Sequence, residues 1–572
     1  MNPENDGRRR ITFKRKIESL EEDRDLLLRL VDTIRNDDSQ TTPGIMNLIR
    51  SSASLEEIRL SLDRGPDSSS SNDVQTKIRR PAVQRFMDVK RLSDVPLYEV
   101  PAQPWTSVTD DDALVSHLIS LYFTWQHPIL NWIDRDLFLR DMRSKNLNSR
   151  FCSPLLVNIP QFYSGYPEAF ARADDPGSRG RHFYEEAIRL LNKEEGRLPL
   201  TTLQARGDIY TSTCVMGKDR LGWQQFVEIA DCVRQFMNKR QSLIREANEQ
   251  AQEMARAIDI TIIGLFSLNP TATLSLQKPS IVKIPKFEPL PQTHGAEDTW
   301  IPYPRQAKSQ QAHTNCVITG VFNLAVILWD ISNYLFGDEK PLSLDPIEAD
   351  AFYYRLTKWA EDLPECISLK NTPTPGVMDM HMRYHNAILV MYGFIQPSLK
   401  QSESAAKDRI KILRLATARA ISAILNQFRS LWPLEYVPMN SMQYATVALF
   451  TLLEDLEDQQ NKKVFGDILT ALRALSRRWQ LAKGMLRLVQ LTAIKEEVNL
   501  PNEAQILFTD FEAELWKADD REQFSSLYPN FAVSINQGKS DLSVDGAELD
   551  RFLDEWDKLA LSEREGESDN KN

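Results

Sequence analysis

From about residue 110 to residue 515, one pattern repeats along the chain: apolar side chains recur every three or four positions, and prolines interrupt the recurrence. That spacing places apolar side chains on one face of an α-helix, whereas a half-buried strand needs strict alternation. No alternating run is long enough for a sheet. We therefore predict an all-α fold with a large multi-helical region, whose helices include residues 114–125, 201–216, 223–236, 244–268, 315–335, 349–363, 378–395, 405–432, 442–456 and 464–498.

Size and composition limit how this helical chain is packed. It has 572 residues, of which 42% are hydrophobic and 26% are charged, as in ordinary water-soluble proteins. A single hydrophobic core rarely grows beyond about 250–300 residues, so we expect two or more packed units. The apolar stretch 316–329 is shorter than the roughly 20 residues of a membrane-spanning helix. It predicts a buried helix, and we expect no membrane partner.

The N-terminal 36 residues combine a basic segment with a short heptad pattern. The basic segment, residues 1–16, is suited to contact DNA phosphates or to direct nuclear import through Arg8, Arg9, Arg10, Lys14, Arg15 and Lys16. Residues 17–36 predict a short coiled coil whose a and d positions form a dimer seam of Ile17, Leu20, Leu27, Val31 and Ile34. Arg24 at an a position weakens that seam. The pattern favours a homo- or heterodimer, and a solvated amphipathic helix without a partner is the alternative.

The remaining chain divides by composition. Residues 37–109 predict a helix over 45–62 and a flexible linker that begins with the Gly-, Pro- and Ser-rich run 63–73. The helical domain spans 110–515. Residues 516–572 form a C-terminal tail that is strongly acidic from residue 541 and that carries an apolar stripe of Leu549, Phe552, Leu553 and Trp556. We expect linker and tail to be disordered and the stripe to fold into the groove of a partner.

The net charge and the reactive side chains limit the binding and catalytic functions that this chain can have. The net charge is −11, so nucleic acid contact requires a local basic patch. The five cysteines contain no C-x-x-C pair, which favours a reducing compartment. His381 and His385 lie four residues apart, as in a helical zinc site, but Met382 stands where the metalloproteases of that type carry a glutamate. No nucleophile or phosphate-loop motif is present. We therefore expect no enzyme, no catalytic residue, and neither metal nor cofactor in this chain.

Several separate stretches resemble one family. They are 122–142 (YFTWQHPILNWIDRDLFLRDM), 152–156 (CSPLL), 217–223 (GKDRLGW), 266–279 (FSLNPTATLSLQKP), 300–304 (WIPYP), 380–397 (MHMRYHNAILVMYGFIQP) and 475–479 (LSRRW). In this order they resemble the regulatory domain of fungal zinc-cluster (Zn2Cys6) transcription factors, over roughly residues 110–500. The resemblance implies a transcription regulator whose helical domain tunes its activity. With it, we expect the protein to be nuclear and dimeric and its acidic tail to be an activation segment that recruits transcription machinery.

The sequence departs from that family in two places. No cysteine precedes Cys152, so the six-cysteine, two-zinc DNA-reading module of the family has no counterpart here, and we expect zinc only if such an N-terminal cluster is restored. Pro160 is also predicted to break the helix that follows Leu155. Together these departures suggest an incomplete gene model, and a natural regulator that lacks DNA binding is the other explanation.

Three hypotheses about function follow. The leading one is a zinc-cluster-type regulator that reaches DNA through a missing or minimal N-terminal module. The second is a truncated or dominant-negative regulator that binds partners without contacting DNA. The third is a helical enzyme or ligand-binding protein of unrelated function.

Overall fold

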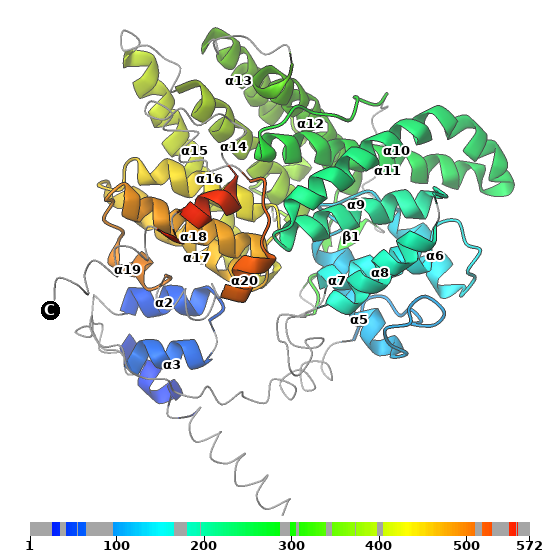
Figure 1. Ribbon diagram of the computed structural model, residues 1–572, viewed down its shortest axis with the longest axis horizontal. Helices are drawn as coiled ribbons and strands as arrows, with labels where there is room; N and C mark the ends of the chain where they lie inside the picture. The colour runs from blue at the N-terminus through cyan, green and yellow to red at the C-terminus, as the bar shows by residue number, and fades with distance from the viewer. Residues whose placement is uncertain are drawn as a thin grey trace, which may run out of the picture.

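The computed structural model describes residues 24–34, 42–63, 95–164, 180–286, 298–338, 346–396, 404–508, 518–528 and 548–558, apart from residues 25, 32, 54, 195, 305–307, 372 and 556. Almost all regular structure in these ranges is helical (Figure 1), which confirms the all-α prediction. The exception is a two-stranded antiparallel ladder in which β1 (Thr299–Trp300) pairs with β2 (Gln310–Gln311). The predicted linker run 64–73 lies outside the described residues.

The helices form two lobes. The N-terminal helices are α2 (Thr42–Arg50), α3 (Leu55–Asp63), α5 (Asp112–Trp125), α6 (Arg135–Arg143), α7 (Pro154–Ser164), α8 (Arg181–Lys193), α9 (Leu200–Val215), α10 (Asp219–Glu246), η2 (Asn248–Gln250) and α11 (Ala251–Leu276). The remaining ones are α12 (Thr314–Phe336), α13 (Pro346–Glu361), η3 (Glu365–Ile367), α14 (Pro375–Ile395), α15 (Ser404–Leu431), η6 (Leu434–Tyr436), α16 (Ser441–Leu453), α17 (Gln459–Ser476), α18 (Gln480–Lys495), α19 (Asn502–Gln505) and α20 (Ala518–Gln523).

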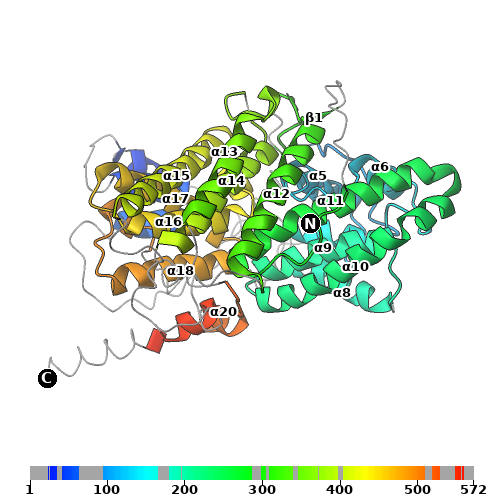
Figure 2. The same cartoon turned by 90° about the horizontal axis from the view of Figure 1, so that it is seen from above.

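The two lobes share one apolar core. Helices α5–α11 form one lobe and α14–α18 the other, and α12 packs against both α11 and α14 between them (Figure 2). Most buried apolar residues of both lobes belong to one continuous cluster, and Leu114, Leu118 and Phe183 form a small separate one. The expectation of two separately packed units is therefore wrong for the described part of the chain. The physical reason is that α12 carries buried residues all along its length and so joins the two cores.

Local sequence signals set several helix starts. Asp111, Asp134 and Asp458 each precede a helix, and each carboxylate accepts a hydrogen bond from the backbone N–H three residues later. Such a cap satisfies one of the donors that the first helical turn leaves without a partner. These caps fix where α5, α6 and α17 begin.

Residues 45–62 and 464–498 are among the predicted helices that the structure divides. Residues 45–62 form α2 and α3, separated by a turn in which Ser52 adopts a positive φ of 60°. Residues 464–498 belong to α17 and α18, separated at Trp479, whose backbone is extended. The residues at both breaks have no strong helix-breaking tendency, so apolar periodicity alone did not reveal them. Tertiary contacts of the two turns, described below, stabilise the breaks.

Two helices continue through a proline where the sequence predicted an end. Helix α7 extends to Ser164 through Pro160, so the predicted break at this proline is wrong. Helix α11 extends eight residues beyond the predicted end at residue 268, through Pro270, to Leu276. A proline inside a helix costs about 3 kcal/mol. Burial of apolar side chains offsets this cost, because each contributes roughly 1.5–3 kcal/mol, and in α7 the fully buried ones are Leu155, Leu156, Val157 and Ile159.

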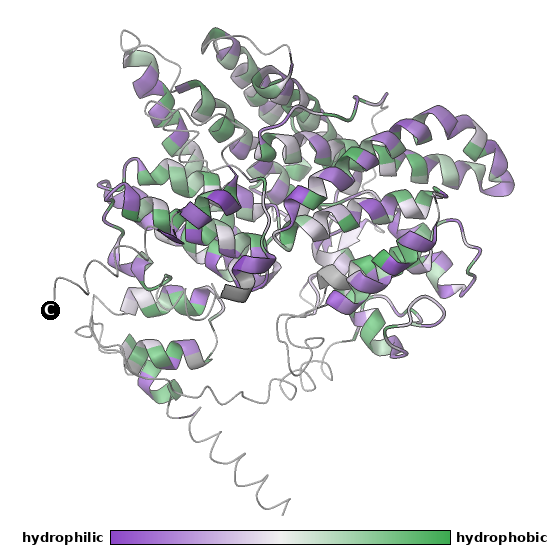
Figure 3. Ribbon diagram, viewed as in Figure 1, coloured by the Kyte–Doolittle hydropathy of each residue, from purple (hydrophilic) through white to green (hydrophobic). Residues whose placement is uncertain are grey.

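Among the described residues, two helices are long and apolar enough to span a membrane by length and composition, namely Asn248–Leu276 and Thr314–Phe336. Their most apolar windows are 89% and 56% buried inside the protein, and α11 and α12 pack against each other. Figure 3 shows most helices carrying both polar and apolar residues, as amphipathic core helices do. The prediction of a buried helix at residues 316–329 is confirmed.

Candidate functional site

Two of the stretches that carry the family resemblance, 122–142 and 300–304, meet at an aromatic junction. The Trp125 ring stacks on Tyr436, with ring centroids 4.4 Å apart, and its indole N–H donates to the Tyr303 carbonyl over 2.7 Å. The Trp300 indole N–H donates to the Thr124 carbonyl, also over 2.7 Å. Stretch 300–304 is thereby fixed against α5, and Trp125 of α5 also packs on η6. These residues are buried and hydrogen-bonded, which assigns this motif a packing role rather than a chemical one.

The described part of residues 24–34 is a helix with two apolar faces. Leu26 is 3% exposed and packs on Leu48 of α2 and Ile58 of α3. The predicted seam residues Leu27, Val31 and Ile34 lie on another face and are 55%, 40% and 42% exposed. The other two predicted seam residues, Ile17 and Leu20, lie outside the described residues. One face therefore anchors this helix to the chain, and the other leaves a seam of apolar residues at heptad spacing open to solvent.

Helices α2 and α3 are fixed to the second lobe by an ionic cluster. Both carboxylate oxygens of Glu57 lie 2.5 Å from the Arg477 guanidinium, and one lies 3.3 Å from Nη2 of Arg473. Arg477 also donates to the Ser51 carbonyl, in the turn between α2 and α3, over 2.8 Å. The Arg473 side chain is only 1% exposed. Stretch 475–479 thus binds the N-terminal helices, and Figure 1 shows α2 beside α19 and below α17, with α3 below α2.

The motif at residues 217–223 holds the C-terminal part of the chain. The buried Asp219 carboxylate accepts hydrogen bonds from the backbone N–H groups of Leu527 and Tyr528, over 2.5 and 3.1 Å. Burial raises the pKa of Asp219 to about 7, against the opposing effect of these hydrogen bonds. The Gly217 carbonyl accepts from the Ser525 N–H over 2.6 Å. A Cβ on Gly217 would lie 2.7 Å from the Phe524 ring, so glycine is what allows the ring to approach.

The acidic tail is not separate from the core where the structure describes it. Leu549 and Leu553 are fully buried, and Phe552 is partly buried against the main core cluster. The expectation that the tail is disordered is therefore wrong for these three residues, because side chains of the main core cover them. Figure 2 shows this segment of the tail beside α18. Trp556 lies outside the described residues.

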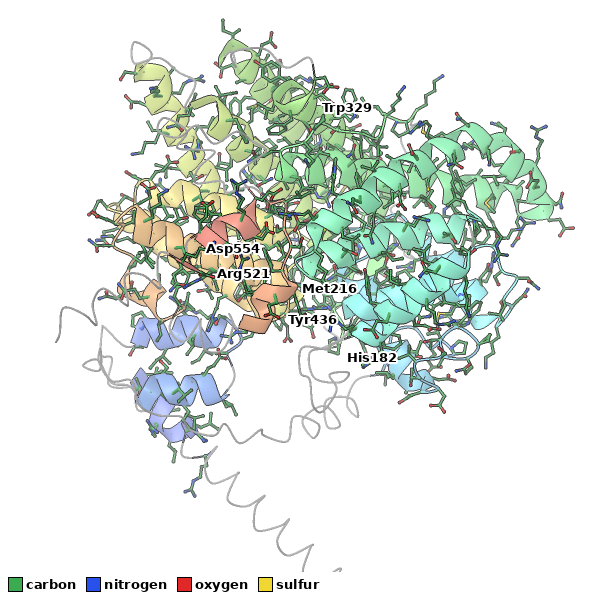
Figure 4. All side chains as sticks on the ribbon, viewed as in Figure 1. His182, Met216, Trp329, Tyr436, Arg521 and Asp554 are labelled. Carbon is green, nitrogen blue, oxygen red and sulfur yellow. The ribbon has the colours of Figure 1, made fainter. Side chains whose placement is uncertain are left out.

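Arginines from three elements surround a helix of the acidic tail, called the tail helix, whose described residues are 549–555, 557 and 558. Arg220 of α10 lies 2.5 Å from Glu548 and 2.8 Å from Asp550. Arg521 of α20 pairs with Asp554, and Figure 4 shows these two labelled side chains next to each other. Arg487 of α18 lies 3.6 Å from a carboxylate oxygen of Asp557. Sequence reasoning did not connect these arginines with the tail. Arg220, Arg487 and Arg521 precede the tail helix by more than 300, 60 and 20 residues, and no local pattern indicates that they contact it.

The cysteines do not fit a zinc cluster. Cys152 and Cys214 are buried among apolar side chains in the first lobe, and Cys232 lies on α10. Cys316 and Cys366 form one neighbouring pair, in which burial and the hydrogen bond with Cys366 raise the pKa of Cys316 to about 11. A zinc site needs deprotonated thiolates in groups of about four. Within the described ranges, no three Cys, His, Asp or Glu side chains are grouped as metal ligands.

The histidine pair is part of the packing of α14. His381 contacts the Ile367 carbonyl over 3.1 Å through Nε2, and His385 packs edge-on against the Tyr384 ring. Burial lowers the pKa of His385 to about 4, so this ring is neutral at physiological pH. The predicted basic segment, with Arg8, Arg9, Arg10, Lys14, Arg15 and Lys16, lies outside the described residues.

Comparison with known proteins decides the family. The chain is 35% identical over 534 residues to the notoamide biosynthesis transcriptional activator notL′ of Aspergillus versicolor, which corresponds to 88% of this chain and 86% of the relative. This chain belongs to the fungal zinc-cluster transcription factors. The regulator is also 27% identical over 434 residues to the nitrogen assimilation transcription factor nirA of Emericella nidulans, and 24% identical over 437 residues to nit-4 of Neurospora crassa.

The extent of these matches differs. The matched region covers 71% and 72% of the regulator but only 47% and 39% of nirA and nit-4. No family model and no solved structure matches the chain. The resemblance that the sequence motifs predicted is confirmed, and the structure adds that three of these motifs bind segments from elsewhere in the chain.

Proposed function

We propose that this transcription regulator works in the nucleus as a dimer that contacts DNA through its N-terminal segment and recruits transcription machinery through its acidic tail. It acts by binding rather than by catalysis, and no metal or cofactor is proposed for this chain. The name of notL′, a transcriptional activator similar over most of both chains, favours activation over repression.

The observation that carries the dimer is the open seam on residues 24–34. Leu27, Val31 and Ile34 follow the spacing of consecutive d, a and d positions, and each exposes 40% or more of its surface. Burying such side chains in a coiled coil contributes roughly 1.5–3 kcal/mol for each one that becomes fully covered. Since Leu26 already anchors a neighbouring face of this helix, a dimer formed here would be joined directly to the helical body.

The six basic residues, Arg8, Arg9, Arg10, Lys14, Arg15 and Lys16, supply the DNA contact in this proposal. Basic side chains that neutralise phosphates release counterions, so the logarithm of the binding constant falls linearly with the logarithm of the salt concentration. At a dimer axis two such segments would lie close together. We expect weak, salt-sensitive binding with little sequence preference from these residues alone.

The oligomeric state tests the dimer. We compare Leu27→Asp with Leu28→Asp by analytical ultracentrifugation of the full chain. Leu27 and Leu28 are 55% and 56% exposed on the same helix, but only Leu27 occupies the predicted seam. Leu27→Asp is expected to give a monomer, and Leu28→Asp to remain mostly dimeric. A wild-type chain that is monomeric at micromolar concentration, or equal effects of the two variants, would contradict the proposal.

A further inference from the structure

The groove that holds the tail helix matches an acidic amphipathic helix in both shape and charge. Its floor includes Gly484 of α18, where an added Cβ would lie 3.7 Å from a methyl group of Leu549 and 2.7 Å from the Phe524 ring. Leu549 and Leu553, one helical turn apart, insert side by side and are fully buried. The groove therefore accepts two large apolar side chains at a spacing of four residues.

The rim of the groove is cationic. Arg220, Arg487 and Arg521 come from three different elements, and each contacts an acidic residue of the tail helix. Arg521 additionally donates to the Asp550 backbone carbonyl. These three arginines surround an apolar floor and give the site a local positive charge, although the net charge of the chain is −11. Apolar contacts supply affinity here, and the arginines select an acidic helix and fix its register.

The tail helix also keeps a polar outer face. Arg551, Asp554 and Glu555 are exposed, whereas Leu549 and Leu553 point into the groove. In this position the apolar stripe is covered by the protein itself. Any other protein that binds the stripe must first displace it from the groove, because a side chain that is fully buried on one surface is unavailable to a second.

We propose that the groove between α10, α18 and α20 is a binding site for acidic amphipathic helices, occupied in cis by the described residues of the tail helix. Cis occupancy hides the apolar stripe from transcription machinery, and an acidic helix from another protein releases the stripe by taking its place. This proposal rests on the proposed function in one respect only, that the stripe recruits transcription machinery once it is free.

The tethered tail sets the strength of this competition. A segment joined to its site by a short connection has an effective concentration on the order of a millimolar. A free peptide of the same sequence with a dissociation constant of about 100 µM would therefore bind the occupied groove about tenfold more weakly than the empty groove. This contrast is large enough to measure directly.

Hydrogen–deuterium exchange on the full chain tests the docking. In Arg220→Glu, the backbone amides of residues 549–555 are expected to exchange at least tenfold faster than in the wild type, because the variant faces Glu548 and Asp550 with a like charge. The matched control is Arg234→Glu, the same change of charge on the same helix, at a residue that is 68% exposed and pairs with Asp231. Equal exchange in the two variants would overturn the proposal.

A second variant separates loss of the ion pair from damage to α10. Adding Glu548→Arg to Arg220→Glu restores an ion pair of reversed polarity and is expected to slow the exchange again. A double variant that exchanges as fast as Arg220→Glu alone would overturn the ionic part of the proposal.

Binding in trans tests whether the groove is a receptor. A fluorescent peptide of residues 545–562 is titrated against the full wild-type chain and against a full chain carrying Leu549→Asp and Leu553→Asp, whose own tail can no longer occupy the groove. Fluorescence anisotropy is expected to show about tenfold tighter binding to the double variant. Equal binding to both chains, or binding to neither, would overturn the proposal.

A transcription reporter then distinguishes this inference from the proposed function. If Arg220→Glu frees the tail in exchange experiments and raises reporter output relative to Arg234→Glu, both are supported. If the tail is freed and the output does not rise, the docking site stands and the activating role of the tail is refuted.

Discussion

Glu57 links the N-terminal helices to the second lobe, and replacing it with glutamine is the most informative single perturbation. Glu57→Gln keeps the shape of the side chain and one oxygen acceptor but removes the negative charge. In the wild type the carboxylate contacts Arg473 and Arg477, both on α17 or at its end. The change should therefore weaken the attachment of α2 and α3 while the helices themselves remain intact.

The magnitude follows from the two contacts. A hydrogen bond to a charged group contributes about 1.5–3 kcal/mol and a neutral one about 0.5–1.5 kcal/mol, so each contact loses about 1–1.5 kcal/mol. Solvent screens little of this loss, because Glu57 is 13% exposed and Arg473 is 1% exposed. We expect the free energy required to detach α2 and α3 from the second lobe to fall by about 2–3 kcal/mol. This equals about a 30- to 150-fold rise in local opening.

Hydrogen–deuterium exchange of residues 42–63 measures this opening directly. The control is Glu361→Gln, the same substitution at an exposed residue near the end of α13. Exchange over α2 and α3 should rise in Glu57→Gln and stay at the wild-type level in Glu361→Gln. If the two variants exchange alike, the ionic cluster does not hold these helices, and the reasoning from its geometry is refuted.

Two further predictions concern the packed core. Burial lowers the pKa of His127 to about 4, against the opposing effect of a hydrogen bond to Ile133. The unfolded chain therefore binds more protons between about pH 6.5 and pH 4, and the free energy of unfolding falls by about 3 kcal/mol as the pH drops through that window. Urea denaturation of His127→Gln should show a shallower pH dependence than the wild type, and an unchanged pH dependence would contradict the burial argument. Gly264→Ala should lower the melting temperature, because the added Cβ would lie 2.6 Å from the Asn131 carbonyl oxygen. In Gly466→Ala the added Cβ meets only Asn47, at 3.9 Å, so the free energy of unfolding should stay unchanged or rise by up to about 1 kcal/mol. Calorimetry that finds Gly264→Ala more stable than Gly466→Ala would refute the reasoning.

Most helices could be predicted from the sequence, because the spacing of apolar residues within a few turns defines the buried face of each helix. The caps at Asp111, Asp134 and Asp458 are signals of the same local kind. Pro160 and Pro270 misled the prediction, because local rules assign a proline its cost but do not include the burial that offsets it. The heptad spacing of Leu27, Val31 and Ile34 was also readable, since three residues on one helix need no tertiary information to share a face.

The contacts that organise the surfaces were not readable in this way. Glu57 and Arg477 are 420 residues apart, and Arg220 and Asp550 are 330 apart. In the sequence each is one of 80 acidic or 69 basic residues, and nothing local states which charges will meet. The acidic tail was predicted to be disordered for the same reason, because the groove that binds it is formed by α10, α18 and α20, which are distant from the tail or from one another in the sequence.

By itself the sequence determined the helical class, the family and the faces of individual helices, because periodicity and short motifs depend on neighbours within a few turns. Only the tertiary structure decided that the lobes share a core, that the N-terminal helices are bound through Glu57, and that Leu549 and Leu553 are buried. Those outcomes depend on which surfaces meet after folding, and the burial of a side chain is a property of the surface that covers it rather than of its own position in the chain.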